Sequence, residues 1–168
     1  TRLFLRLFRD VRRDRPDVIY SRHNHILFVP ALIAKWYKIK LVLEVNGRLL
    51  EEIPFVDRSI MGRILYRTGV FKFLESFNMK SAAVLIAVTD GIKAYVLKHY
   101  RVPTEKLHVV LNGVDVDFFK PENAEAAREE LGLDRDAVYI GYIGSFYHWQ
   151  GMHHIVEAAQ MVYQERPQ

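Results

Sequence analysis

Short apolar runs alternate along this chain with longer segments of helical period. Runs of four to eight residues rich in Val, Ile and Leu are predicted strands: residues 17–21, 40–45, 82–88, 108–111 and 138–143. The amphipathic segments that separate them are predicted helices: residues 3–14, 28–36, 59–80, 89–100, 122–131 and 152–164. Strands that alternate with helices build parallel sheets with helices packed on their faces. The sequence therefore predicts the α/β class, with a Rossmann-like parallel sheet flanked by helices.

Local signals place several of these boundaries. Pro30 lies in the first turn of a predicted helix, where its missing N–H costs no hydrogen bond. Thr89 or Asp90 is a predicted N-cap, because a side-chain oxygen there can accept a backbone N–H of the first turn. Gly69 is expected to interrupt the long helix 59–80, and Gly132 is expected to close the helix before it.

Composition restricts the class of protein. Half of the 168 residues are hydrophobic and 26% are charged, which is typical of globular proteins rather than disordered chains. No apolar run approaches the roughly 20 residues that a membrane-spanning helix needs. The chain has no cysteine, which excludes disulfide bonds and thiolate metal sites. This usage fits a reducing compartment, and we expect a cytoplasmic protein.

Positive charge is concentrated in the first half. The formal net charge is +4, but residues 1–80 have a balance of +8 and residues 81–168 a balance of −4. Two Arg-rich amphipathic segments, Thr1 to Arg15 and Arg58 to Lys80, are suited to contact with anionic headgroups. An anionic membrane surface is therefore a candidate partner, on the inner face of the membrane. Nucleic acid is not expected, because the chain has no interleaved aromatic and basic platform.

The middle of the chain contains a distinctive series of short motifs. Leu111-Asn112-Gly113-Val114-Asp115 is followed by Phe118-Phe119-Lys120-Pro121 and then by a run from Tyr139 to Phe146. These motifs resemble those of glycosyltransferase family 4, whose members have the two-domain GT-B fold. The resemblance implies that residues 1–121 are the latter part of an acceptor-binding domain. It implies that residues 122–168 are the hinge and the first strand and helix of a nucleotide-sugar-binding domain.

The resemblance also implies an activity. Members of the family transfer a sugar from a nucleotide-diphosphate sugar to a glycan or lipid-linked acceptor, with retention at the anomeric carbon and without a metal ion. The nucleotide sugar is a co-substrate, and no further cofactor is implied. The family's first glycine-rich loop is expected before Thr1 and its paired glutamates beyond Gln168, so the chain alone is expected to be inactive.

Gly144 to Gly151 resembles the donor-phosphate loop of the family. A strand ending on Gly before a helix N-terminus presents backbone N–H groups to a diphosphate. Many members have an Arg and a Lys where this chain has Ser145 and Gln150, so binding here is expected to depend on backbone amides. The alternative is a plain strand-to-helix turn with His148 and Trp149 at the surface.

Polar residues follow two predicted strands at the sheet edge where ligands bind in α/β proteins. Asn46 occupies the position at which many family members have a catalytic histidine, and it can orient a hydroxyl or the phosphate leaving oxygen. Glu44 and Gly47 flank it, on the predicted acceptor side. Asn46 and Gly47 are equally compatible with a simple turn.

Arg22 and His23 end the preceding strand and are also placed on the acceptor side. Arg22 is suited to a bidentate contact with an acceptor phosphate. Ordinary surface-loop positions are the alternative. His23 and His25 have no carboxylate or cysteine beside them to complete a ligand set, so no metal site is predicted.

Asn112, Gly113 and Asp115 resemble the hinge of the family. Asn112 can hold the turn, and the Asp115 carboxylate can accept backbone N–H groups. Two other functions stay open: a sugar- or nucleotide-binding module that has lost catalysis, and, less favoured, a basic nucleic-acid-binding α/β domain. A steep dependence of binding on salt would identify the latter.

Overall fold

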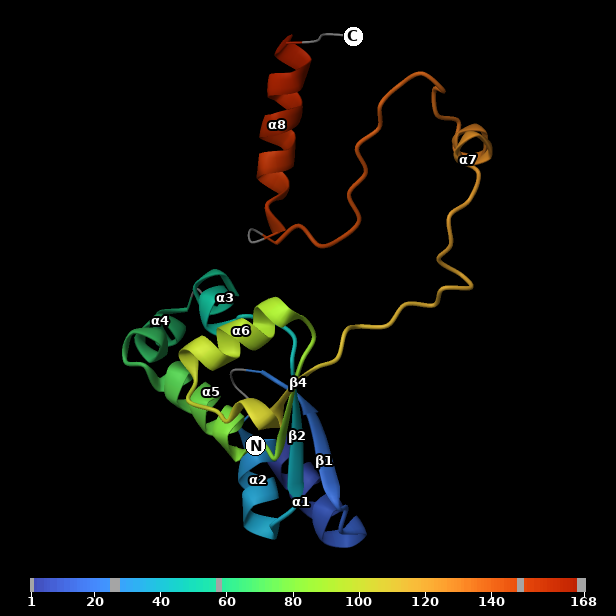
Figure 1. Cartoon of the computed structure of the whole chain (residues 1–168). Helices are drawn as coiled ribbons and strands as arrows, with labels where there is room; N and C mark the ends of the chain where they lie inside the picture. Colours follow the sequence, from blue (N-terminus) through green and yellow to red (C-terminus); the bar gives the residue numbers. More distant parts are fainter. Residues whose placement is uncertain (1, 25–27, 57–58, 148–149, 166–168) are drawn as a thin grey trace. The chain divides into compact units, whose positions relative to one another are not determined.

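The computed structural model describes residues 2–24, 28–56, 59–147 and 150–165, and the chain divides into two compact units between Asn112 and Gly113. The first unit is built on a four-stranded sheet in the order β1-β2-β3-β4, and every neighbouring pair is parallel (Figure 1). The strands are β1 (Val18–Arg22), β2 (Lys40–Val45), β3 (Val84–Ala87) and β4 (Leu107–Val109). The predicted fold class, a Rossmann-like α/β sheet, is confirmed.

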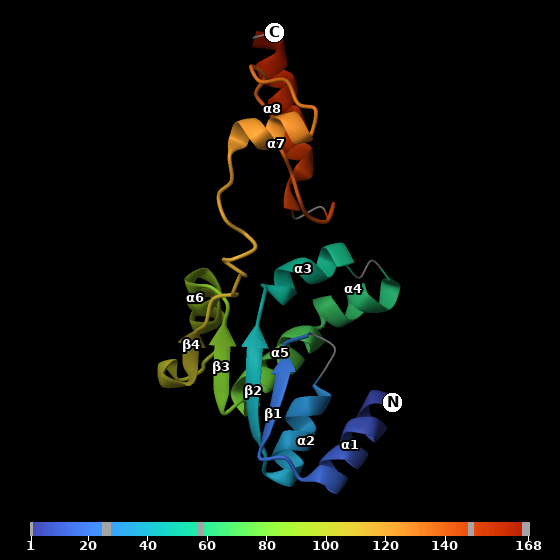
Figure 2. The same ribbon diagram turned by 90° about the vertical axis from the view of Figure 1, so that its right-hand side faces the viewer.

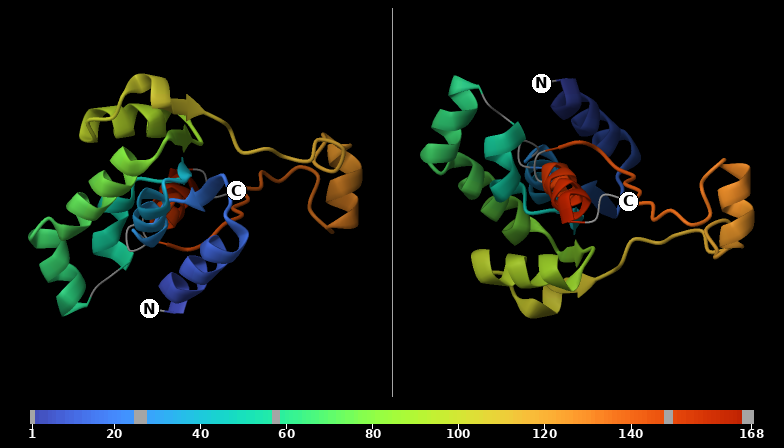
Figure 3. Two further views of the ribbon diagram at one scale, coloured as in Figure 1. Left: turned by 90° about the horizontal axis from the view of Figure 1, so that it is seen from below. Right: turned by 90° about the horizontal axis from the view of Figure 1, so that it is seen from above.

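Helices precede and connect these strands. They are α1 (Arg2–Asp14), α2 (Val29–Tyr37), α3 (Leu49–Val56), α4 (Ile60–Arg67), α5 (Val70–Ser81), α6 (Asp90–His99) and the 3-10 turn η1 (Thr104–Lys106). Figure 3 shows α1 and α6 at opposite ends of the first unit. Gly69, at φ 77°, separates α4 from α5, as the sequence predicted. Helix α3 was not predicted, because Pro54 inside it argues against a helix. The side chain of Ile53 in this helix is nevertheless buried, at 1% exposure.

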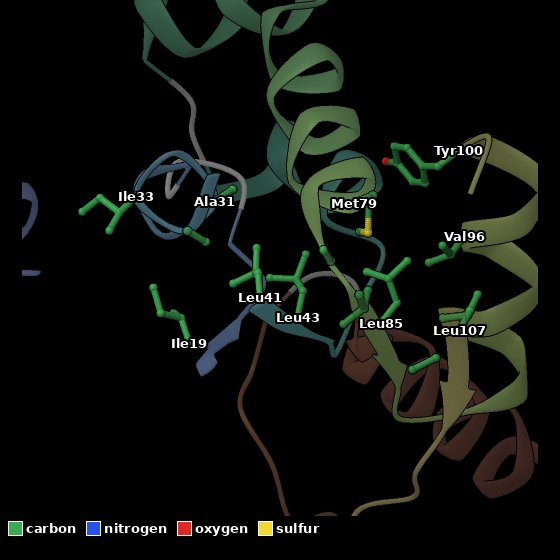
Figure 4. Packing of buried hydrophobic residues seen from close by; sticks show 14 of the residues in the cluster. Ile19, Ala31, Ile33, Leu41, Leu43, Met79, Leu85, Val96, Tyr100 and Leu107 are labelled. Carbon is green, nitrogen blue, oxygen red and sulfur yellow. The ribbon is translucent and has the colours of Figure 1, made fainter. Parts of the chain in front are cut away.

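The hydrophobic core lies against one face of the sheet. Inward side chains of all four strands contribute: Ile19, Leu41, Leu43, Leu85 and Leu107. Figure 4 shows them facing residues of α2, α5 and α6, among them Ala31, Met79 and Val96. Apolar residues at alternate strand positions point to one face, and so this burial sets the register of each strand. The alternate positions of β1 are open, with Val18 46% and Tyr20 58% exposed.

The second unit contains α7 (Ala124–Glu130) and α8 (Met152–Glu165). The prediction of a strand over residues 138–143 was wrong, since this segment has no regular structure. A strand needs a neighbour to complete its hydrogen-bond ladder, and no other strand forms in the described part of this unit. Val138, Ile140 and Ile143 are consequently 91%, 74% and 102% exposed. The predicted functional boundary after residue 121 stays a prediction.

No helix among the described residues is long and apolar enough to span a membrane.

Candidate functional site

The carboxyl ends of the strands meet at one edge of the sheet. Ladder hydrogen bonds continue past the strands: the backbone N–H of His23 donates to Glu44 O at 2.7 Å, and that of Val110 donates to Ala87 O at 3.0 Å. Helix α3 follows β2 at this same edge (Figure 2). The residues predicted for the acceptor side therefore lie on neighbouring strands, with Arg22 directly opposite Glu44 in the register of β1 and β2.

Glu44 is the centre of a hydrogen-bonded chain at this edge. Its carboxylate accepts the hydroxyl of Tyr20 on β1. Its Oε1 also accepts the Nδ2 amide of Asn46, at 2.6 Å. These two hydrogen bonds lower the pKa of Glu44 below its ordinary value, and the nearby charge of Arg22 adds to the effect. Glu44 is thus held as a carboxylate, which fixes the amide plane of Asn46.

Tyr20 was not among the residues chosen from the sequence. Its hydroxyl is found only when the register of β1 and β2 is known, because the two partners are 24 positions apart. The bond to Glu44 raises the pKa of Tyr20, so the phenol stays protonated and keeps donating well above neutral pH.

The substitution Tyr20→Phe is expected to raise the pKa of Glu44 toward 4.5, its ordinary value. A carboxyl whose pKa is lowered in the folded state stabilises the fold above its unfolded pKa and ceases to do so as pH falls through the folded pKa. The variant should therefore be less stable than the original chain at pH 7, and the difference should be smaller at pH 3. Titration of the Glu44 carboxyl by NMR, with urea unfolding at both pH values, measures this. An unchanged pKa would contradict the assigned hydrogen bond.

Gly47 and Thr89 complete the edge. A Cβ at Gly47 would lie 2.7 Å from Glu52 Oε1, so the end of the Glu52 side chain of α3 lies close to the backbone there. Thr89 follows β3 and caps α6, since its Oγ1 accepts the backbone N–H of Ile92 at 3.1 Å. The predicted N-cap is confirmed.

His23 has a different environment from the one that its place on the acceptor side suggests. Its ring is buried on the core side, where Nε2 lies 3.1 Å from Glu75 Oε1 on α5. The two side chains are 1% and 0% exposed. The second nitrogen, Nδ1, and Glu75 Oε2 make no hydrogen bond within the described residues. In this structure His23 anchors the end of β1 next to Arg22.

Two tyrosines of α6 and its C-terminus lie beside this pair. Burial raises the pKa of Tyr100, and the Glu75 carboxylate adds to that effect. Burial and Glu75 raise the pKa of Tyr95 in the same way. The Tyr100 hydroxyl is buried without a well-formed hydrogen bond to a described residue. We name His23, Glu75, Tyr95 and Tyr100 the buried polar cluster; apart from His23, none of its residues was predicted from the sequence as a site residue.

Tyr142 organises the predicted donor-phosphate loop in the second unit. Its hydroxyl donates to the backbone carbonyl of Ser145 at 2.7 Å and lies 3.3 Å from Gln150 Oε1. A side chain at Gly144 would meet that hydroxyl at 2.8 Å. Gly151, at φ 72°, leads into α8. The loop residues chosen from the sequence are thus brought together, although their binding role stays a prediction; His148 and Trp149 lie outside the described residues.

The predicted hinge has one structured residue. Asp115 Oδ1 accepts the backbone N–H groups of Asp117 and Phe118 at 3.0 and 3.1 Å. Gly113 has open space around it, and Asn112 is exposed. The local turn at Asp115 agrees with the sequence, and the hinge function of the three residues stays a prediction.

In the part of the chain that the structure describes, no three His, Cys, Asp or Glu residues are grouped closely enough to hold a metal ion. His25 lies outside that part.

Comparison with known proteins identifies relatives. The sequence model of Glycosyltransferase Family 4 matches residues 1–118. An alpha-D-kanosaminyltransferase of Streptomyces kanamyceticus is 26% identical over 91% of this chain and 41% of its own length. A UDP-Gal:alpha-D-GlcNAc-diphosphoundecaprenol alpha-1,3-galactosyltransferase of Escherichia coli is 28% identical over 93% of this chain and 39% of its own.

A third relative is more similar in sequence. The D-inositol 3-phosphate glycosyltransferase 1 of Catenulispora acidiphila is 31% identical over 85% of this chain and 33% of its own length. The chain therefore spans well under half the length of these three relatives.

Proposed function

This chain belongs to glycosyltransferase family 4, and from that premise we propose that it is part of a retaining, metal-independent glycosyltransferase. The enzyme moves a sugar from a nucleotide-diphosphate sugar to a glycan or lipid-linked acceptor. The observation that carries this proposal is the match of the family model to the unit whose strand edge holds Glu44, Asn46 and Arg22 together. The relatives' printed names, which are all those of sugar-transferring enzymes, favour it.

Asn46 is the proposed catalytic residue. One of its amide N–H groups is used by Glu44, and the second N–H and Oδ1 make no other hydrogen bond to a described residue. Transfer with retention needs stabilisation of the departing phosphate oxygen, which an oriented N–H supplies. Glu44 is a positioning residue in this proposal, because it acts on the substrate only through Asn46.

Arg22 supplies the positive charge of the acceptor side. Its guanidinium is exposed at the end of β1, where it is available to a phosphate of the acceptor in the two-pronged geometry that arginine favours. In the second unit, the backbone amides at Gly144, Ser145, Gln150 and Gly151 are the proposed contacts of the donor diphosphate, at the start of α8. The charge pair that many family members place in that loop is absent from this sequence.

The proposal is tested by a donor screen on the longest natural protein that contains this chain, with the chain alone in parallel. UDP-, GDP- and ADP-sugars are supplied with and without EDTA and anionic liposomes, and nucleotide release and sugar transfer are measured. Turnover of one donor that EDTA does not change supports the proposal. A folded protein that binds a donor without turning it over would contradict it and favour the binding module.

The substitution Asn46→Ala is expected to lower kcat about 10- to 100-fold with little change in KM, since hydrogen bonds to charged groups contribute about 1.5–3 kcal/mol. The matched control is Asn123→Ala, because Asn123 caps α7 through the backbone N–H of Glu125 and is outside the proposed site. Steady-state kinetics on the donor found in the screen measures both. Equal activity of the two variants would remove Asn46 from the mechanism.

Peripheral membrane contact is a second part of the proposal. On α4, Ile60, Met61 and Ile64 are 72%, 63% and 48% exposed and share the helix with Arg63 and Arg67. Exposed apolar residues beside arginines suit the headgroup region of an anionic membrane. Phe71, in the same predicted basic segment from Arg58 to Lys80, is buried in the core instead, at 5% exposure. Arg58 and Thr1, which open the two basic segments, lie outside the described residues.

A further inference from the structure

A pocket of about 640 Å³ opens at the amino ends of β2, β3 and β4. This is the edge opposite to the candidate site; in Figure 2 the amino ends of the strands lie away from α3. Lys40 begins β2, and five residues further on Val45 ends it, so the two edges are roughly 16 Å apart at about 3.3 Å per residue. The two regions are therefore separate sites.

Five lysines line this pocket, which we name the lysine pocket: Lys35, Lys38, Lys40, Lys80 and Lys106. They come from the end of α2, the start of β2, the end of α5 and the residue before β4. No carboxylate of a described residue lines the pocket. The C-termini of α2 and α5 contribute roughly half a negative charge each, which leaves a local balance of about +4.

These positive charges are not neutralised within the described chain. Lys106 Nζ donates to the backbone carbonyl of Ala82 at 3.3 Å, and Lys35 Nζ lies 5.8 Å from the ring centroid of Phe77. None of the five lysines forms an ion pair with a described carboxylate. Like charges gathered in one concave site repel each other, and they raise the local concentration of anions.

The walls of the pocket suggest what kind of anion fits. Ile39, Phe73 and Phe77 supply apolar surface among the lysines, and Ser76 and Ser81 supply hydroxyls. A second pocket, of about 680 Å³, shares Lys38, Ile39 and Lys40 with the first. It adds two arginines and one carboxylate: Arg12, Arg15 and Asp17. A ligand with an anionic group and an apolar portion matches this lining better than a bare ion.

We propose that the lysine pocket is a binding site for a phosphate ester, distinct from the candidate site at the carboxyl ends of the strands. Lys38, Lys40 and Lys80 hold the phosphate oxygens by charge-assisted hydrogen bonds, and Phe73 and Phe77 contact the apolar part of the ligand. The phosphate comes either from a soluble compound or from a lipid headgroup, since both present the same chemistry. This site does not depend on the proposed sugar transfer.

The test measures binding of two probes to the whole chain. Soluble pyrophosphate is titrated by calorimetry, and phosphatidylcholine vesicles with and without phosphatidic acid are tested by co-sedimentation. The pocket variant is Lys38→Gln with Lys80→Gln, both at exposed positions. The matched control is Lys98→Gln with Arg101→Gln, two exposed cations of the first unit that line neither pocket. Circular dichroism and thermal unfolding confirm that each variant is folded.

We expect the pocket variant to weaken binding of pyrophosphate, of the anionic vesicles or of both at least tenfold, and the control to bind as the original chain does. Loss with pyrophosphate alone favours a soluble phosphate compound as the ligand, and loss with vesicles favours a lipid headgroup. The proposal is overturned if neither probe binds, if the pocket variant binds like the original, or if the control weakens binding as much as the pocket variant.

Discussion

Glu75→Ala is expected to lower the free energy of unfolding of this chain by about 3–5 kcal/mol, because it leaves a buried polar side chain without its partner and opens a cavity. The carboxylate of Glu75 is fully buried, and its Oε1 is the partner of His23 Nε2. Its loss leaves the His23 ring buried without that partner and opens a cavity next to Tyr100. Since small domains are stable by only about 5–15 kcal/mol, this change removes a large part of the total. Urea unfolding at pH 7 measures it.

Two further variants distinguish the loss of the His23–Glu75 contact from the loss of packing. Glu75→Gln keeps the size of the side chain and a hydrogen-bonding group for His23, so its loss should be smaller. The double variant His23→Leu with Glu75→Met replaces both polar groups by apolar ones and should also lose less than Glu75→Ala. If the double variant were the least stable of the three, packing rather than the unpaired histidine would explain the result.

Leu85→Ala is expected to cost about 3–4 kcal/mol, because Leu85 is fully buried in the middle of β3 and its removal leaves a cavity. Its neighbours Leu43 and Leu107 belong to the two adjacent strands, β2 and β4, as Figure 4 shows. No single element can therefore move to fill the space. The matched control is Leu5→Ala on α1, where the leucine is 61% exposed. Urea unfolding should show a loss at Leu85 several times that at Leu5. Equal losses would mean that the core of the sheet is not packed as described.

The two stability predictions bear on function because both elements position the candidate site. Glu75 holds His23, the residue next to Arg22, and Leu85 supports β3, whose end carries the capping residue Thr89. A variant at either position should therefore lose activity in proportion to the unfolded fraction. Asn46→Ala, in contrast, should lose activity while it stays folded.

Most elements of the fold were predictable from sequence because their signals are local. A short apolar run predicted β2 with the bounds that the structure has, residues 40–45, and Pro30, Gly69 and Thr89 marked boundaries that the structure has. Helix α3 was missed because its proline gives the opposite local signal. The strand at 138–143 was predicted wrongly because an apolar run specifies a strand only where another strand pairs with it.

The candidate site was predictable in part. Glu44 and Asn46 are two positions apart at a strand end, so their place at the sheet edge follows from the sequence alone. Tyr20 and Glu75 were missed, since each meets its partner across many positions of the chain, 24 for Tyr20 and 52 for Glu75. One sequence signal pointed to Glu75. It lies on the same face of α5 as the buried residues Phe71 and Met79, and a carboxylate on a buried face needs a partner.

The sequence by itself determined the α/β class and most helix and strand positions. It also determined the family, through the motifs in its middle segment. These features depend on periodicity, turn residues and short motifs, which act between near neighbours. Only the tertiary structure decided that His23 turns inward to Glu75, that Tyr20 and Asn46 converge on Glu44, and that five lysines line one pocket. Such contacts depend on strand register and helix packing, and these follow from the collective burial of apolar side chains far apart in the chain.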